Sequence, residues 1–382
     1  MFHAERDDDL HKNGINGRAV CFWSWNSDMA EEEIRLQMEE FAQGRFGGVI
    51  IHARAGLRIP YMGDAWFAAF RTAVAQAKRL GLEIYIYDED GWPSGFASGR
   101  IPELGDAYCF KRLEHAASNR WGDRLLAVYR GDAKAGYRRI APADAKEGDL
   151  FFGYTIDRHY VDLLYPDTAQ KFLEFVYERY AAEVGDAFGD PIKGVFTDEP
   201  QLNCAGYPWS VGLPDAFEKA YGYSLWDNLW LLAADCGEDR RFRYEFWQLV
   251  GDIFRQTFTL PVSQWCERNG LVMTGHFACE DGLCDQISSC GGIMGHYALM
   301  QLPGMRMQDA YRLAHYDESL HRAAQAVEQG VVQRIQQRAA RPAENGIRPG
   351  GAATVHPDVA SMTRAQREAL ERRVLHGAQI EL

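Results

Sequence analysis

Residues 192–200 read IKGVFTDEP, a short apolar run that ends in two carboxylates and a proline. Four more runs have this form: CFWSWN (21–26), GVIIHAR (48–54), LEIYIYDEDGW (82–92) and LVMTGHFACED (271–281). A parallel strand buried on both faces has a continuous apolar sequence. In β/α barrels the functional side chains gather at the carboxyl ends of the strands. The five runs therefore predict parallel strands that share one polar rim.

Helical patterns separate these runs, as in successive βα units. Ser27 and Asp28 are candidate caps for a helix over AEEEIRLQMEEFAQG, and Asp64 for a second helix that ends at Gly81. A third helix begins after Asp167, and residues 214–269 are mostly helical. Pro261 is predicted to kink or break that last stretch.

Residues 106–165 have a different character, with short β-like stretches separated by turns. This pattern predicts a small antiparallel β insertion. The fold prediction is α/β: a (β/α)8 TIM-type barrel over residues 18–305, incomplete, with this insertion.

Composition limits the partners. The net charge is -13, with 41 basic against 54 acidic residues, which argues against a nucleic-acid groove. No segment approaches the roughly 20 apolar residues that cross a bilayer. The polar N-terminus lacks the apolar core of a signal peptide, so a cytoplasmic location is expected.

The eight cysteines form no CxxC pair; free thiols are favoured over a metal–thiolate site near Cys279 and Cys284.

Asp198 and Glu199 end the 192–200 run, and Pro200 fixes the exit of the chain. Because successive strand side chains point to opposite faces, one of the two is expected at the barrel mouth. A carboxyl group in a partly apolar setting has a raised pKa, which suits a general acid for glycoside cleavage. The alternative is a structural pair that caps a helix or holds an arginine.

The other strand ends supply further candidates. Asp88, Glu89 and Trp92 combine hydrogen-bond acceptors with an aromatic face, as sugar sites do, or they form a hydrated loop. His52 and Arg54 are two residues apart and share a side if the strand persists. The remaining candidates at the first strand are Trp23, Trp25 and Asn26, although the tryptophans can equally belong to the core.

His276, Glu280 and Asp281 follow the fifth strand. Glu280 is the candidate partner of Glu199 in a two-carboxylate glycosidase, at a separation that sequence cannot give. An acid-rich mouth is also compatible with a calcium ion, although no EF-hand loop is present. The absence of GxGxxG, P-loop and GxSxG motifs excludes a recognisable nucleotide cofactor site or serine hydrolase.

The blocks FWSWN, EEIRLQMEEFAQGRFGGVIIHARAGLRIPYM, WFAAF to YDEDGWPSG, and GVFTDEPQL with PWS and LP resemble the barrel of glycoside hydrolase family 106 α-L-rhamnosidases, over residues 18–305. The resemblance implies inverting hydrolysis of α-linked rhamnose in plant-type glycosides, with calcium often at the site. By position, Glu199 looks like the general acid. The residues that look like sugar- or ion-contacting residues are His52, Arg54, Asp88, Glu89, Trp92, His276 and Asp281.

The resemblance ends near Met305. Residues 306–382 contain eleven Arg but no Lys, Trp or Phe, and no recognisable version of the strand that carries the family's second catalytic Glu. The tail is either weakly helical or the product of a different reading frame. In the second case the chain has five or six of the eight strands and lacks its catalytic base. A chain without that base is not expected to hydrolyse glycosides efficiently. Two other classes stay open: a non-catalytic carbohydrate-binding barrel, and a metal-dependent hydrolase that uses His52, His276 and Asp88.

Overall fold

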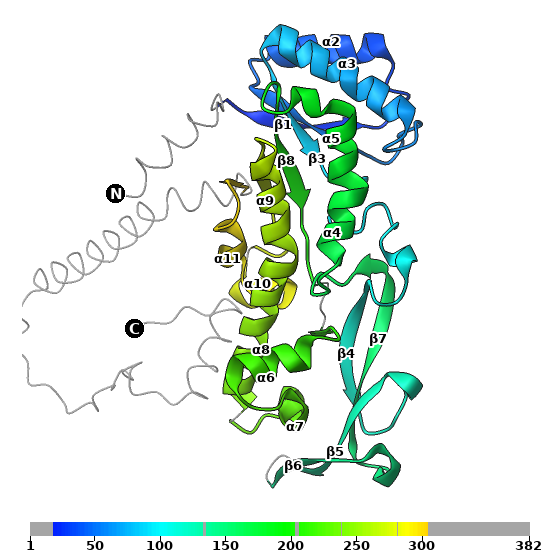
Figure 1. Cartoon of the computed structure of the whole chain (residues 1–382), viewed down its shortest axis with the longest axis vertical. Helices are drawn as coiled ribbons and strands as arrows, with labels where there is room; N and C mark the ends of the chain where they lie inside the picture. The colour runs from blue at the N-terminus through cyan, green and yellow to red at the C-terminus, as the bar shows by residue number, and fades with distance from the viewer. Residues whose placement is uncertain (1–17, 133–134, 203–205, 238, 281, 305–382) are drawn as a thin grey trace, which may run out of the picture. The chain divides into compact units, whose positions relative to one another are not determined.

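The computed structural model describes residues 18–132, 135–202, 206–237, 239–280 and 282–304 (Figure 1). The chain divides into two units, 1–312 and 313–382, and all described residues lie in the first. The predicted tail at 306–382 and the candidate residue Asp281 lie outside the described residues. Among the helices of the described part, none is long and apolar enough to cross a membrane.

The larger sheet is parallel, with the strand order β1-β2-β3-β8-β10-β11. Each of the five apolar runs forms one of its strands, so the sequence prediction of parallel strands is confirmed. The sixth strand, β11, was not predicted because it is only two residues long. The strands are β1 (Val20–Trp25), β2 (Gly48–Ala53), β3 (Glu83–Tyr87), β8 (Ile192–Asp198), β10 (Val272–His276) and β11 (Leu302–Pro303).

This sheet is open in the part of the chain that the structure describes. A barrel closes only when its first and last strands pair, and here β1 and β11 stand at opposite ends of the strand order. The architecture is therefore mixed α/β with six parallel strands, and a complete eight-stranded barrel is not formed by the described residues.

Helices connect the parallel strands as predicted, but their caps differ. The helix α2 (Glu31–Gln43) begins after Ala30 and α3 (Asp64–Leu80) after Gly63, neither with a side-chain cap bond. Ser27 and Asp28 therefore lie too early to cap α2, and Asp64 is already inside α3. Instead, acidic residues in the first turn of each helix stabilise it by interacting with the positive end of the helix dipole. The helices α2 and α3 pack side by side (Figure 1).

Pro261 lies in an unbroken helical path. A π-helical turn, η7 (Arg255–Thr259), joins α8 (Asp239–Phe254) to α9 (Leu260–Arg268), whose first turn contains the proline. The wider turn accommodates a residue that lacks an N–H group and crowds the preceding turn. The other helical segments are η1 (Pro102–Leu104), η2 (Gly122–Arg124), η3 (Pro142–Asp144), α4 (Thr168–Phe172), the π-helical η4 (Leu173–Tyr177), α5 (Glu178–Val184), η5 (Gly185–Ala187), α6 (Leu213–Tyr221), α7 (Leu225–Asn228), η6 (Leu229–Leu232), α10 (Leu283–Cys290) and α11 (Ile293–Tyr297).

The two faces of the parallel sheet belong to different apolar clusters. One face carries a small cluster of Ile50, Tyr85, Tyr87, Phe196 and Val272. The other face contributes the alternate residues of the strands to the main core, where helix side chains join them. The small-cluster face is the one that leads to the candidate site.

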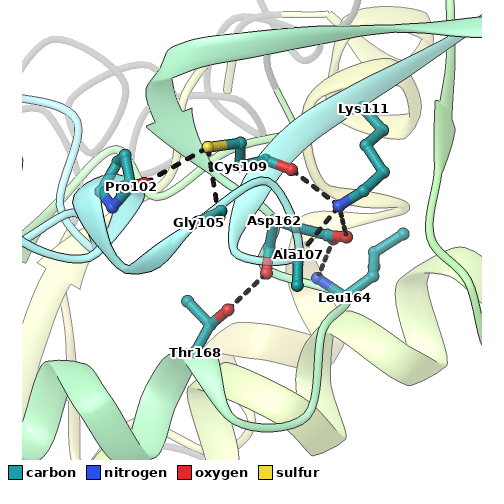
Figure 2. Close-up of polar contacts among 8 residues, drawn as sticks. All are labelled: Pro102, Gly105, Ala107, Cys109, Lys111, Asp162, Leu164 and Thr168. Carbon is teal, nitrogen blue, oxygen red and sulfur yellow. Dashed lines mark hydrogen bonds and ion pairs between the residues drawn. The ribbon is translucent and has the colours of Figure 1, made fainter.

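A second, antiparallel sheet has the order β6-β5-β7-β4-β9. Four of its strands lie within residues 106–165, where the sequence predicts the β insertion, and the fifth, β9 (Tyr207–Trp209), comes later in the chain. At its base, the buried Lys111 ammonium donates to the carbonyls of Ala107 and Cys109, both at 2.9 Å, and to Asp162 at 3.3 Å (Figure 2). This ion pair joins the first strand of the insertion to the residue that directly follows its last strand. The strands are β4 (Cys109–Ala116), β5 (Leu125–Asp132), β6 (Gly136–Ile140), β7 (Leu150–Val161) and β9 (Tyr207–Trp209).

Candidate functional site

A pocket of about 350 Å³ opens at the carboxyl ends of the parallel strands. Strands β1, β2, β8 and β10 and the loop after β3 contribute to it, as the shared-rim prediction expects. Its lining residues are Phe22, Ser24, His52, Arg54, Trp92, Asp198, Glu199 and His276. Six of these eight were candidates from sequence, namely His52, Arg54, Trp92, Asp198, Glu199 and His276.

Asp198 and His276 are direct partners in the register of β8 and β10. This register brings His276 Nε2 to 2.8 Å from Asp198 Oδ1. On its other side, His276 Nδ1 lies 3.0 Å from Glu280 Oε1. Two tyrosines complete the chain: Tyr87 donates to Asp198 Oδ2 at 2.5 Å, and Tyr297 donates to Glu280 Oε2 at 2.7 Å.

His276 is a cation in this chain of hydrogen bonds. Burial by itself lowers the pKa of His276, but the hydrogen bonds and charges of Asp198 and Glu280 outweigh burial and raise that pKa to about 9. The pKa of Asp198 moves the other way: burial raises it, and the hydrogen bonds from His276 and Tyr87 bring it below its usual value. Both shifts describe an imidazolium held between two carboxylates at pH 7.

Asp198 and Glu199 both line the pocket, whereas strand alternation predicts that only one faces it. The reason is local: Glu199 has a φ of 51° and so leaves the strand in the left-handed region. Its N–H donates to the carbonyl of His276 at 3.0 Å, which anchors this turn to the neighbouring strand. A non-glycine residue in this conformation is costly and is often found at functional sites.

Asp88 and Glu89 do not line the pocket, contrary to the sequence prediction. Both are fully buried. Asp88 accepts hydrogen bonds from Ser94 at 2.6 Å and Tyr177 at 2.7 Å, and burial raises its pKa to about 7. Glu89 accepts four backbone N–H bonds from residues 95–98. These carboxylates therefore hold the loop after β3 and do not line the pocket.

The same loop presents Trp92 to the pocket, as predicted. Trp92 is 59% exposed, and the guanidinium carbon of Arg54 lies 5.1 Å from the centre of its ring. Ser94 ties the loop to β8, because its hydroxyl accepts from Asp198 N at 2.8 Å and its N–H donates to Asp198 O at 2.7 Å. The aromatic side chain is thus exposed on an anchored loop.

At β1 none of the three candidates lines the pocket, and the alternative that the tryptophans belong to the core is confirmed. Trp23 and Trp25 are buried in the main core, and Asn26 is exposed but does not line the pocket. Phe22 and Ser24 line it instead. The signal that finds them is pairing: Ser24 is the register partner of His52, and register partners in a parallel sheet share a face.

Glu280 lies behind His276 and outside the pocket lining. Each of its carboxylate oxygens has a hydrogen-bond partner. Glu280 is therefore placed to position His276. The sequence predicts Glu280 as the partner of Glu199 in the pocket, but it does not line the pocket.

The pocket has one group of possible metal ligands within the described residues. Asp198, Glu199 and His276 each offer one atom, and these atoms lie within 4.8 Å of one another. Calcium takes six to eight oxygen ligands from carboxylates, carbonyls and water. Asp198 and Glu199 offer carboxylate oxygens for the expected calcium ion, whereas the imidazole nitrogen of His276 is not a ligand type that calcium prefers. His52, His276 and Asp88, the donor set of the alternative metal-dependent hydrolase, do not form such a group among the described residues.

The comparisons with known proteins are sparse. No protein-family model matches the chain, and no curated protein is significantly similar to it. Among solved structures it is similar to a rhamnosidase from Novosphingobium sp. PP1Y, with 12% sequence identity, a TM-score of 0.49, and coverage of 71% of this chain and 47% of the rhamnosidase. The chain thus spans about half the length of that structure, and a likeness this distant does not assign it to a family.

Proposed function

We propose that this pocket binds a sugar and belongs to a glycosidase. The enzyme hydrolyses α-L-rhamnosides or related plant-type glycosides with inversion of the anomeric configuration. The observation that carries the proposal is the position of Glu199, at the wall of a pocket that also exposes Trp92 and Phe22. Aromatic faces pack against the C–H side of a sugar ring. The preference for rhamnose comes from the sequence motifs, as does the proposal that the six parallel strands are part of a (β/α)8 barrel.

In this proposal Glu199 is the general acid. It protonates the glycosidic oxygen as the bond to the leaving group breaks. Asp198 cannot take this role easily, because His276 and Tyr87 hold it as a carboxylate. The imidazolium of His276 offsets the charge of Asp198 beside the reacting group.

A second candidate function has a specific observation in its favour. Inverting glycosidases need a second carboxylate about 6.5–9.5 Å from the acid, with room for a water molecule. Among the described residues that line the pocket, Asp198 is the other carboxylate, and an oxygen of it lies within 4.8 Å of Glu199. This spacing favours a non-catalytic carbohydrate-binding protein if no other carboxylate reaches the pocket.

The test is hydrolysis and binding of an aryl α-L-rhamnoside by the full chain. Glu199→Gln is expected to lower turnover by about 10²–10⁴-fold, as for loss of a general acid, while sugar binding persists. Glu103→Gln, which changes an exposed carboxylate outside the pocket, serves as the matched control. Binding without turnover by the wild type supports the second candidate, and the absence of binding contradicts both.

A further inference from the structure

A basic hollow lies on the β insertion, between the β5–β6 hairpin and the loop that follows it. Its volume is about 530 Å³, and it shares no lining residue with the pocket at the parallel strands. Its charged lining residues are Arg130, Arg138, Lys146 and Asp144. The whole chain, by contrast, has a net charge of -13. The hollow therefore gathers positive charge on a protein that is acidic overall.

Arg130 builds the wall of this hollow. Its Nε and Nη2 donate to the two carboxylate oxygens of Asp149 at 2.9 and 2.7 Å, and Nη2 also donates to the carbonyl of Asp144 at 2.8 Å. The N–H of Lys146 donates to the same Asp149 at 2.7 Å. The hydrogen bond from Arg130 lowers the pKa of Asp149, so Asp149 is a carboxylate at pH 7 and offsets the charge of Arg130. These bonds fix the loop over residues 141–146 against β5.

Arg138 and Lys146 supply the cations that this wall does not use. Neither side chain has a hydrogen bond or an ion pair to any described residue. Arg138 is the direct register partner of Arg130 across β5 and β6, and like charges directly opposite each other destabilise a sheet. With Asp149 included, three cations meet two carboxylates, which leaves one positive charge over. An anion in the hollow would relieve this repulsion.

The side-chain chemistry narrows the kind of anion. A guanidinium group matches two oxygens of a carboxylate or phosphate, and an ammonium group adds a further donor. A long polyanion such as a nucleic acid is disfavoured, because the negative net charge outside the hollow would repel it. A compact ligand with one oxyanion group fits both observations.

We propose that this hollow is an oxyanion-binding site, in which Arg138 and Lys146 bind the carboxylate or phosphate group of a small ligand. Arg130 and Asp149 position the two walls and do not bind the anion themselves. The site has no residue in common with the pocket of the proposed function. The two proposals can therefore fail independently.

The experiment is calorimetric titration of the full chain at low ionic strength with inorganic phosphate, with D-galacturonate and with neutral D-galactose. We expect at least one of the two anions to bind, and more weakly as sodium chloride is added, because salt screens exposed charges. Arg138→Gln is expected to weaken that binding about tenfold, as for loss of one charge-assisted hydrogen bond. The double variant with Lys146→Gln should weaken it further. Both residues are exposed, so the variants are expected to fold.

The matched control is Arg139→Gln, which removes the same charge one residue further along β6. The guanidinium carbon of Arg139 lies 5.1 Å from the centre of the Trp226 ring, and Arg139 does not line the hollow. This variant is expected to bind the anion as the wild type does. Equal losses in Arg138→Gln and Arg139→Gln would show an effect of overall charge only and would overturn the proposal.

The probes distinguish the two sources of the oxyanion. Binding of phosphate without galacturonate assigns the site to a phosphate group, and binding of galacturonate without galactose assigns it to a carboxylate. Binding of neither anion overturns the proposal, as does anion binding that is undiminished in the double variant and therefore lies elsewhere. None of these results depends on whether the chain hydrolyses a glycoside.

Discussion

Two clusters of charged side chains, one buried and one half-buried, differ in what remains available to a ligand. At the base of the antiparallel sheet, Lys111 uses its three N–H groups on two backbone carbonyls and Asp162 (Figure 2). At the pocket, His276 also bonds at both nitrogens, but Asp198 and Glu199 line an open cavity as well. Burial and ion pairing alone therefore do not mark a functional site. The second cluster is a candidate because an open cavity adjoins its charges.

The comparison predicts its largest effect for Lys111→Met. This change leaves the Asp162 carboxylate buried without its cation, and Asp162 is only 2% exposed. We expect the free energy of unfolding to fall by about 3–5 kcal/mol, as for other broken buried pairs, when measured by urea denaturation. Sugar affinity at a temperature where the variant is folded is expected to stay unchanged.

The matched control is Arg158→Ala, which breaks an exposed ion pair with Asp106 in the same part of the fold. Exposed pairs contribute at most about 1 kcal/mol. If Lys111→Met costs no more than this control, the Lys111 cluster does not hold the base of the insertion together. The double variant Lys111→Met with Asp162→Leu should recover part of the loss, because no buried charge remains.

At the pocket, His276→Gln is expected to have a smaller effect on stability and a larger one on binding. The substitution removes the cation between Asp198 and Glu280 but leaves a group that can still donate to one of them. We expect a loss of about 1–3 kcal/mol in unfolding free energy together with weaker sugar binding, measured by urea denaturation and NMR titration. A variant that loses stability but keeps full sugar affinity would place His276 in the same structural class as Lys111.

The pH dependence of stability sharpens the same comparison. The pKa of His276 is raised to about 9, above its usual value near 6.5 in an unfolded chain. Its contribution to stability is therefore full below about pH 6.5 and is lost as the pH rises through 9. Urea denaturation between pH 7 and 10 should show this loss in the wild type, and a smaller one in His276→Gln. Equal slopes in the two proteins would contradict a charged His276.

Most of the pocket could be predicted from sequence because its residues follow parallel strands. The carboxyl ends of such strands meet at one edge, so Asp198 and His276 could be placed together although they are 78 positions apart. The side of β1 that faces the pocket could not be predicted, because Phe22 and Trp23 are both aromatic and the sequence does not give the register. The pairing of Ser24 with His52 decides it.

The remaining errors concern loops and antiparallel pairing. Asp88 and Glu89 follow a strand as Asp198 does, but hydrogen bonds from Ser94 and from the backbone of residues 95–98 hold them inside the protein. No pattern in the sequence predicts a loop that binds its own carboxylates in this way. The ion pair of Lys111 with Asp162 was not predicted for a related reason. The turns between antiparallel strands set their register, and the local sequence does not give the pairing of two residues that are 51 positions apart.

The smallest predicted effect is at Glu280, and it tests whether His276 is held from both sides. Glu280→Gln removes a charge but keeps an oxygen that can accept a hydrogen bond. Because one negative neighbour is lost, we expect the pKa of His276 to fall from about 9 yet to stay above 6.5, since Asp198 remains in contact. An NMR titration of the His276 ring measures this pKa.

Sugar affinity should change little in Glu280→Gln, because Glu280 does not line the pocket. The control Asp198→Asn should lower both the pKa of His276 and the sugar affinity. An unchanged pKa in Glu280→Gln would mean that Asp198 alone holds the imidazolium, and Glu280 would then stabilise the loop through Tyr297 only.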